Sequence, residues 1–245
     1  MRVVALINHN LGLMLREPGP LISRIVMPVV LMTVLRPLYL AAVPTGGTSQ
    51  AVTGILVMFS LLGMSVTGAS ILAERVWHTA DRLRTSPARP AEIMVGKAVP
   101  VLFLLLAQQA VLLTYGVLVL GLRVANLGLL AVAVFGWAVA LLGLGAAVAT
   151  LVRSQGELSA ATDVGGLICT CLGGALVPLA SLPSWAQALA PASPGYWAMR
   201  ALGSALAGQA PATLAATGTL VAVGLAAAVV AGAKLARGWG RARLL

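Results

Sequence analysis

Residues 51–97 read AVTGILVMFSLLGMSVTGASILAERVWHTADRLRTSPARPAEIMVGK and join a long apolar run to a highly charged connection. A helix of about 20 apolar residues crosses a hydrocarbon layer of about 30 Å. The rest of the chain continues this pattern, because 60% of its 245 residues are hydrophobic, 9% are charged, and the mean hydropathy is +0.99. Soluble domains carry about a quarter charged residues. The composition therefore predicts an all-α protein of the membrane.

Six apolar runs predict six transmembrane helices. They lie at about 21–43, 51–72, 98–122, 127–151, 160–180 and 211–235. The connections between them are short and leave no room for a soluble catalytic domain. We therefore expect one polytopic membrane domain over residues 1–245.

The first 20 residues lack the continuous apolar core and the small-residue cleavage site of a removable signal. Their apolar residues recur at helical spacing, at Val4, Ile7, Leu11 and Leu15. The pattern predicts an amphipathic helix in the membrane interface, ended by the Pro-Gly-Pro of residues 18–20. A frayed tail is the alternative.

The basic residues indicate which side of the membrane each end faces. If the N-terminus is cytoplasmic, the Lys and Arg residues fall in cytoplasmic segments, with Arg36, Arg123 and Arg200 as the exceptions. An even number of spans then returns the C-terminus to the cytoplasm. The net charge of +10 is thus a topology signal, helped by anionic lipid, and nucleic-acid binding is not expected.

All six acidic residues lie near the cytoplasmic face in this topology, and only Asp163 falls inside a predicted span. A proton-coupled carrier normally needs a carboxylate in mid-membrane for its relay. Secondary transport is therefore disfavoured. The energy for moving a cargo uphill is expected to come from another chain.

No segment carries the pattern of an enzyme. Residues 95–98 lack the first Gly and the Ser or Thr of a phosphate-binding loop, and His9 and His78 lack metal-ligand spacing. Cys169 and Cys171 are about 200° apart on a helix, which disfavours a disulfide and indicates packing. We expect no catalytic residue, metal or cofactor on this chain.

The connection after the second predicted span has helical periodicity. Its apolar positions Leu72, Val76, Ala80 and Leu83 share one face, and charged residues take the others. Pro87 ends this helix before a new one begins ahead of the third span. A short surface helix joined to two spans suits docking of a partner, although i,i+4 charge pairing explains some of the pattern.

These features resemble the permease subunit of type-2 ABC transporters, in the daunorubicin/doxorubicin-resistance-like branch of bacterial exporters. The matching residues, in chain order, are Leu15-Arg16-Glu17-Pro18 and Pro28, then Glu74-Arg75, Asp81-Arg82-Leu83-Arg84-Thr85-Ser86-Pro87 and Gly96-Lys97, and finally Leu182-Pro183-Ser184-Trp185 with Pro191, Pro194 and Arg200. The chain departs from the family at Trp77-His78-Thr79, where a small residue or Gly is more usual.

The resemblance implies an ATP-driven exporter of a hydrophobic or amphiphilic, drug-like compound in the bacterial cell membrane. It implies two copies of this chain with two copies of a separate ATPase, which holds ATP and Mg. Nucleotide bound to the ATPase would shift the permease between two conformational states. The ATPase would act through the charged face of the connection between the second and third spans. The residues of this face are Glu74, Arg75, Asp81, Arg82 and Arg84.

Two other functions stay open at this point. One is export of a lipid-linked glycan or polysaccharide, which the transmembrane spans alone do not exclude. The other is a structural, regulatory or immunity subunit that binds a toxic compound without pumping it.

Segment 181–210 is interrupted too often by proline to span the membrane, yet it is apolar. It predicts two short helices that dip into the outer leaflet, with Trp185, Tyr196 and Trp197 as an external gate. An ordinary external loop with a tryptophan anchor is the alternative.

Candidates for the cargo path are Arg36 in the first span and Gln108 and Gln109 in the third. The alternatives are that Arg36 snorkels to the lipid head groups and that the glutamines bond to another helix.

Overall fold

A computed structural model describes residue 12 and residues 18–43, 46–76 and 90–236. In this part of the chain there are eight α-helices and no strand. The helices are α2 (Pro18–Ala42), α3 (Gly47–Val76), α5 (Pro90–Leu118), α6 (Leu127–Leu151), α7 (Gln155–Leu172), α8 (Ser184–Leu189), α9 (Pro194–Leu206) and α10 (Ala210–Ala236). Two 3₁₀ turns, Leu179–Ser181 and Ala190–Ala192, flank α8. The expected interfacial helix and residues 77–89 of the charged connection lie outside the described residues.

Five of the helices are long and apolar enough to cross a membrane. Their candidate spans are Ile22–Ala42, Gly47–Leu72, Ala98–Leu118, Leu127–Leu151 and Ala210–Lys234. The chain is therefore a multi-pass membrane protein. The fifth predicted span, 160–180, differs most from the structure, because α7 covers Gln155–Leu172 and is not among these five.

Local interactions explain where α7 begins and ends. The Ser154 side chain accepts a hydrogen bond from the Glu157 backbone N–H, and the Glu157 carboxylate accepts one from the Arg153 N–H at 2.7 Å. This reciprocal capping starts the helix before the apolar run. The helix ends at Gly173-Gly174, where Gly174 has a φ of +75° that favours glycine.

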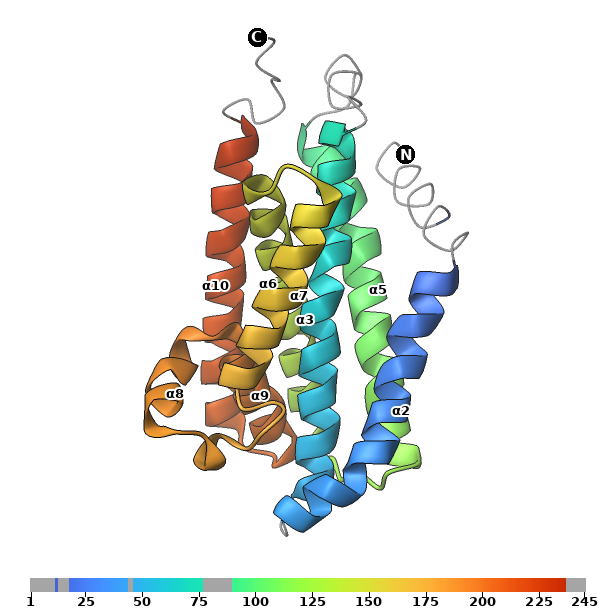
Figure 1. The fold of residues 1–245 in the computed structure, drawn as a ribbon, viewed down its shortest axis with the longest axis vertical. Coiled ribbons are helices and arrows are strands. Elements are labelled where there is room, and N and C mark those ends of the chain that lie inside the picture. The colour runs from blue at the N-terminus through green and yellow to red at the C-terminus, as the bar shows by residue number, and fades with distance from the viewer. Residues whose placement is uncertain (1–11, 13–17, 44–45, 77–89, 237–245) are drawn as a thin grey trace.

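The six longest helices lie side by side and define two ends of the bundle (Figure 1). At one end α3 finishes at Val76, α5 begins at Pro90 and α10 finishes at Ala236; we call this the Val76 end. The opposite end carries α8 and α9, and we call it the α9 end. Helix α7 runs along α3, as the spanning helices do (Figure 1).

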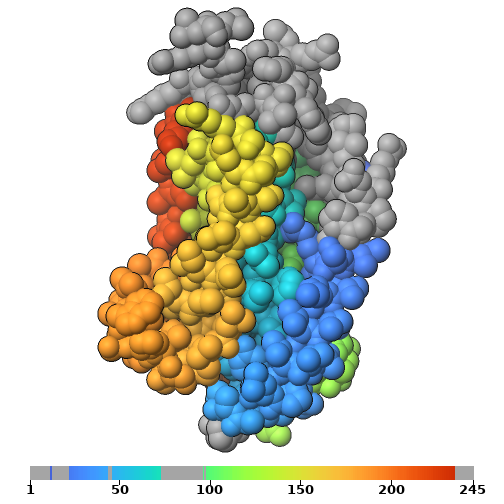
Figure 2. Space-filling model, in the orientation of Figure 1, coloured from blue at the N-terminus to red at the C-terminus, as the bar shows by residue number. Residues whose placement is uncertain are grey.

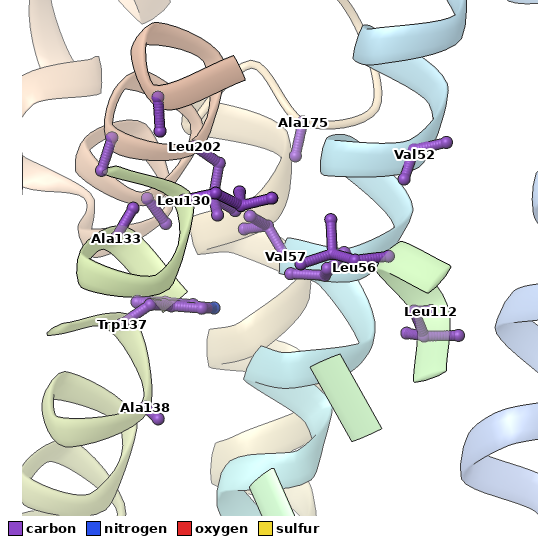
Figure 3. Close-up of a cluster of buried hydrophobic side chains, with 14 of the residues drawn as sticks. Val52, Leu56, Val57, Leu112, Leu130, Ala133, Trp137, Ala138, Ala175 and Leu202 are labelled. Atoms are coloured by element: carbon purple, nitrogen blue, oxygen red, sulfur yellow. The ribbon is translucent and has the colours of Figure 1, made fainter. Parts of the chain in front are cut away.

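The main core lies where α3, α5, α6 and α9 meet. Figure 3 shows Val57 of α3 next to Leu130 of α6 and Leu202 of α9. Trp137 is completely buried in this cluster, so it packs against protein.

Small residues bring the helices close together. Helix α10 packs most extensively on α6, where a Cβ added to Gly143 would fall on the Gly224 carbonyl oxygen. Helix α7 packs on α3 in a similar way, because a Cβ on Gly68 would lie 2.6 Å from a methyl group of Leu158. Between membrane helices, close backbone approach of this kind takes the place of the hydrophobic effect as a source of stability.

Candidate functional site

Helices α2 and α7 pack on α3 from two sides and leave one face of α3 only partly covered. Residues 51–57 of α3 are completely covered, but further along the helix a stripe at helical spacing is half-buried. Figure 1 shows the reason: α2 leans away from α3 toward its own N-terminal end. Figure 2 shows α3 between α2 and α7. We call this surface the α3 groove; its floor is formed by Met58, Leu62, Ser65, Val66 and Ala69.

The groove is closed toward the α9 end by hydrogen bonds to the segment that follows α7. The Tyr39 hydroxyl of α2 donates to the Leu176 carbonyl at 2.8 Å. The Gln50 amide of α3 donates to the Gly174 carbonyl at 2.7 Å and reaches the Ala175 carbonyl at 3.5 Å. We call these contacts the clasp. They satisfy irregular backbone that would otherwise be unpaired among apolar side chains.

Glycine at position 54 allows the clasp to form. The Ala175 carbonyl lies where a Cβ of Gly54 would be, and Ala175 is completely buried. Any other residue at position 54 would push the segment off α3. Sequence reasoning missed the clasp, although Gly54 and the Gly173-Gly174 pair were visible signals of close backbone contact.

Helix α9 docks on the C-terminal end of α7. The Ser193 hydroxyl donates to the Cys169 carbonyl at 2.8 Å and also accepts from the Gly195 N–H at 3.1 Å. One side chain therefore caps α9 and pairs a terminal carbonyl of α7. Behind this contact α9 buries a face of small residues and Leu202 against the core.

The structure brings two of the three predicted gate residues together. The Tyr196 and Trp197 rings meet edge to face with centroids 5.2 Å apart, and the Trp197 indole donates to the Pro191 carbonyl at 2.9 Å. Arg200 joins them: its guanidinium lies 5.9 Å from the Trp197 ring and 3.3 Å from the Tyr196 hydroxyl. Trp185 is on α8 and 63% exposed. Their role as a gate stays a prediction.

The predicted path residues lie on α2 and α5, where Gln108 and Gln109 are buried and Arg36 is half-buried. Gln109 is completely buried, and its amide donates back to the Leu105 carbonyl of its own helix at 3.3 Å. The Gln108 amide nitrogen is buried without a partner, while its oxygen faces Gly63. Arg36 lies one turn from Thr33, whose hydroxyl contacts the Tyr115 hydroxyl of α5 at 2.6 Å. Gln108 therefore faces α3 at Gly63, the residue whose carbonyl accepts a hydrogen bond from Arg24. The role of all three residues in transport stays a prediction.

A different arginine reaches the groove. Arg24 of α2 donates to the Gly63 carbonyl at 3.3 Å and to the Ser65 hydroxyl at 3.2 Å, both on α3. Twelve residues separate Arg24 from Arg36, which places them about 120° apart around α2. Asp163 on α7, across the groove, is near enough to interact electrostatically with Arg24. Sequence reasoning counted Arg24 only as a topology charge; the missed signal was its position beyond the first turn of a spanning helix.

The position of Arg24 in its span bears on its role. Arg24 is the third residue of the candidate span Ile22–Ala42, about 12 Å from its middle at 1.5 Å per residue, and its side chain reaches acceptors about 5–8 Å from the middle of Gly47–Leu72. Arginine within a membrane span is rare and is normally paired, and near a span end its side chain can also extend toward the head groups. Arg24 is a site candidate because its guanidinium joins α2 to α3 beside the groove floor.

The predicted coupling residues are almost entirely beyond what the structure describes. Glu74 and Arg75 lie in the last turn of the α3 backbone. Asp81, Arg82 and Arg84 fall outside the described residues, so the docking face stays a prediction.

Long apolar helices that pack side by side define a class of protein, the multi-pass membrane protein. Residues 1–206 match the family model described as ABC-2 type transporter, and this chain belongs to that family of membrane transport components. It is also similar to the probable multidrug ABC transporter permease YbhR of Escherichia coli, from strain K12 and from O157:H7, with 29% identity over 140 residues. That match covers 56% of this chain and 38% of the relative's length.

Proposed function

We propose that this chain is the permease subunit of an ATP-driven exporter that moves a hydrophobic or amphiphilic, drug-like compound out of a bacterial cell. The observation that carries the proposal is the α3 groove, closed at one end by the clasp, in a member of the ABC-2 family. In alternating access, each state of a transporter closes the cargo path at one end and leaves it wider at the other. The multidrug name of the YbhR relative supports a drug-like cargo.

In this proposal residues 1–245 form one membrane domain with α7 as the sixth span, and the Val76 end faces the cytoplasm. The positive-inside rule supports this orientation, because the exposed Arg153 and Lys234 lie at that end. The clasp then closes the external end of the groove, next to the predicted gate of Trp185, Tyr196 and Trp197.

Energy comes from ATP and Mg on a separate ATPase subunit, two copies of which act with two copies of this chain. The α3 groove is lined by one chain on three sides, so a second copy would complete a path between the two molecules. ATP-driven closure of the ATPase pair moves the Val76 end of α3 and shifts the equilibrium between the two groove states.

The proposal is tested by purifying the chain together with its ATPase. The complex, reconstituted in nanodiscs, is expected to hydrolyse ATP faster when amphiphilic drug-like compounds are added. Pumping by this chain alone, or the absence of any ATPase that binds it, would contradict the proposal.

Charge reversal on the connection tests the coupling face. Changing Arg82→Glu and Arg84→Glu together is expected to weaken ATPase binding by about tenfold or more, because two attractive contacts become repulsive. The measurement is the affinity of the ATPase for permease in nanodiscs, with membrane insertion checked separately. Arg241→Glu with Arg243→Glu is the matched control, since it reverses the same two charges at the same spacing in the C-terminal tail. An equal effect of both pairs would remove Arg82 and Arg84 from the docking role.

A further inference from the structure

Arg24 is held on α3 by two neutral acceptors. The Gly63 carbonyl and the Ser65 hydroxyl accept from its two terminal nitrogens at 3.3 and 3.2 Å, which is the long end of the hydrogen-bond range. Guanidinium carries five N–H donors in a planar fork that matches a carboxylate or a phosphate. These contacts position the fork, and neither acceptor carries a charge.

The only carboxylate that the structure places in electrostatic contact with Arg24, among the described residues, is Asp163. Asp163 is exposed on α7, and Leu167 lies one turn further along the same face of that helix. The Arg24 hydrogen bonds go to α3 and not to Asp163. The cation and the carboxylate therefore face each other across the groove, with Arg24 already seated on the floor.

Beyond Arg24 the groove is apolar as far as the clasp. Leu31 lies seven residues after Arg24, on the same face of α2, and is half-buried. Met58 and Leu62 form the floor at this level, and Leu167 is 47% exposed on the α7 side. The site thus has one cationic group at one end and an apolar strip leading toward the α9 end.

We propose that the α3 groove binds an amphiphile with one anionic group, whose carboxylate or phosphate contacts Arg24 and Ser65 while its apolar part lies along Leu31, Leu62 and Leu167. The inference rests on the proposed function, because it narrows the class of cargo. Asp163 opposes the ligand's charge from the other wall and weakens its binding. No other cation lines the described floor or walls.

Binding is measured directly, so that failure of this inference is distinct from failure of the export proposal. The full chain is placed in nanodiscs of neutral phosphatidylcholine, and a fluorescent C12 fatty acid is compared with its methyl ester. The wild-type chain is expected to bind the acid at least about tenfold more tightly than the ester, because only the acid can form charge-assisted hydrogen bonds with Arg24. Arg24→Gln should lose that preference, because glutamine keeps hydrogen bonding but not the charge. Neither the ATPase nor pumping enters this measurement.

Two more variants separate a binding role from a structural one. Asp163→Asn is expected to tighten binding of the acid about two- to fivefold and to leave the ester unchanged, because it removes a repulsive charge. Arg24→Lys keeps the charge and should retain part of the preference, which covers the case in which Arg24→Gln fails to fold. Arg123→Gln is the matched control, since it removes one exposed positive charge outside the groove.

The source of the anion is resolved by competition. Dodecyl phosphate should displace the fluorescent acid, and inorganic phosphate at the same concentration should not. If the fluorescent acid binds less in nanodiscs that contain phosphatidylglycerol, the anionic lipid competes for the site. That result would support the site and identify lipid as an occupant. Equal loss of acid and ester binding in Arg24→Gln and Arg24→Lys, or competition by inorganic phosphate as strong as that by dodecyl phosphate, would overturn the proposal.

Discussion

Gly143→Ala is expected to lower the free energy of unfolding by about 1–3 kcal/mol or more, although it adds a single methyl group. The new Cβ would fall on the Gly224 carbonyl oxygen of α10. In the reverse direction, a Cβ on Gly224 would lie 2.6 Å from the Ala140 Cα of α6. Both contacts are with backbone, so no side-chain rotation relieves them. The two helices must separate along the most extensive helix pair of the described fold.

The measurement is thermal unfolding of the detergent-solubilised protein, followed by its tryptophan fluorescence. Gly218→Ala and Gly232→Ala on α10 are matched controls, because a Cβ at either position meets no atom within 4 Å. Both should leave the Tm unchanged or raise it slightly through better helix propensity. If Gly143→Ala unfolds at the same temperature as these controls, the close contact of α6 with α10 does not stabilise the protein.

Gly54→Ala is expected to open the clasp. Its Cβ would occupy the position of the Ala175 carbonyl, so residues 174–176 must leave α3. The Gln50 and Tyr39 hydrogen bonds to the Gly174 and Leu176 carbonyls are then lost and replaced by bonds to water, at a net cost of about 1 kcal/mol each. We expect a probe at position 176 to be labelled at least about tenfold faster by maleimide, since local opening governs its access. The measurement uses Leu176→Cys in a Cys169→Ser, Cys171→Ser background.

Two controls separate the clasp from general damage to the fold. Gly165→Ala adds the same methyl group to α7, where a Cβ meets nothing within 4 Å. Gln50→Leu should reproduce part of the Gly54→Ala effect, whereas Gln187→Leu should not, because Gln187 is exposed and bonds only to the nearby Leu182 carbonyl at 2.8 Å. Unchanged labelling in Gly54→Ala would show that the clasp does not close the groove.

The predicted span 127–151 coincides with α6, and four other predicted spans overlap long apolar helices. These elements follow from local composition, because a helix in a bilayer must satisfy its own backbone and be as long as the apolar layer. The predicted span 160–180 lies several residues later than α7, which covers Gln155–Leu172, because the prediction followed apolar composition alone. Glu157 and Ser154 start α7 by capping, in a polar segment that a search for apolar runs passes over.

The site residues depended on tertiary structure. Arg24 and Arg36 are both arginines inside one apolar run, and the sequence favoured Arg36, yet Arg24 reaches the α3 groove. The tilt and rotation of α2 on α3 determine which of the two arginines reaches the groove. Both are set by contacts between residues far apart in the chain. Tyr39 meets Leu176, and Gly54 meets Ala175, because α7 packs on α3 and brings the segment after it to these helices. Apolar length and charge balance thus determined by themselves that this chain lies in a membrane as helices. The position of the groove, its cation and its closure arise from helix packing, because side-chain direction depends on how neighbouring helices fit together.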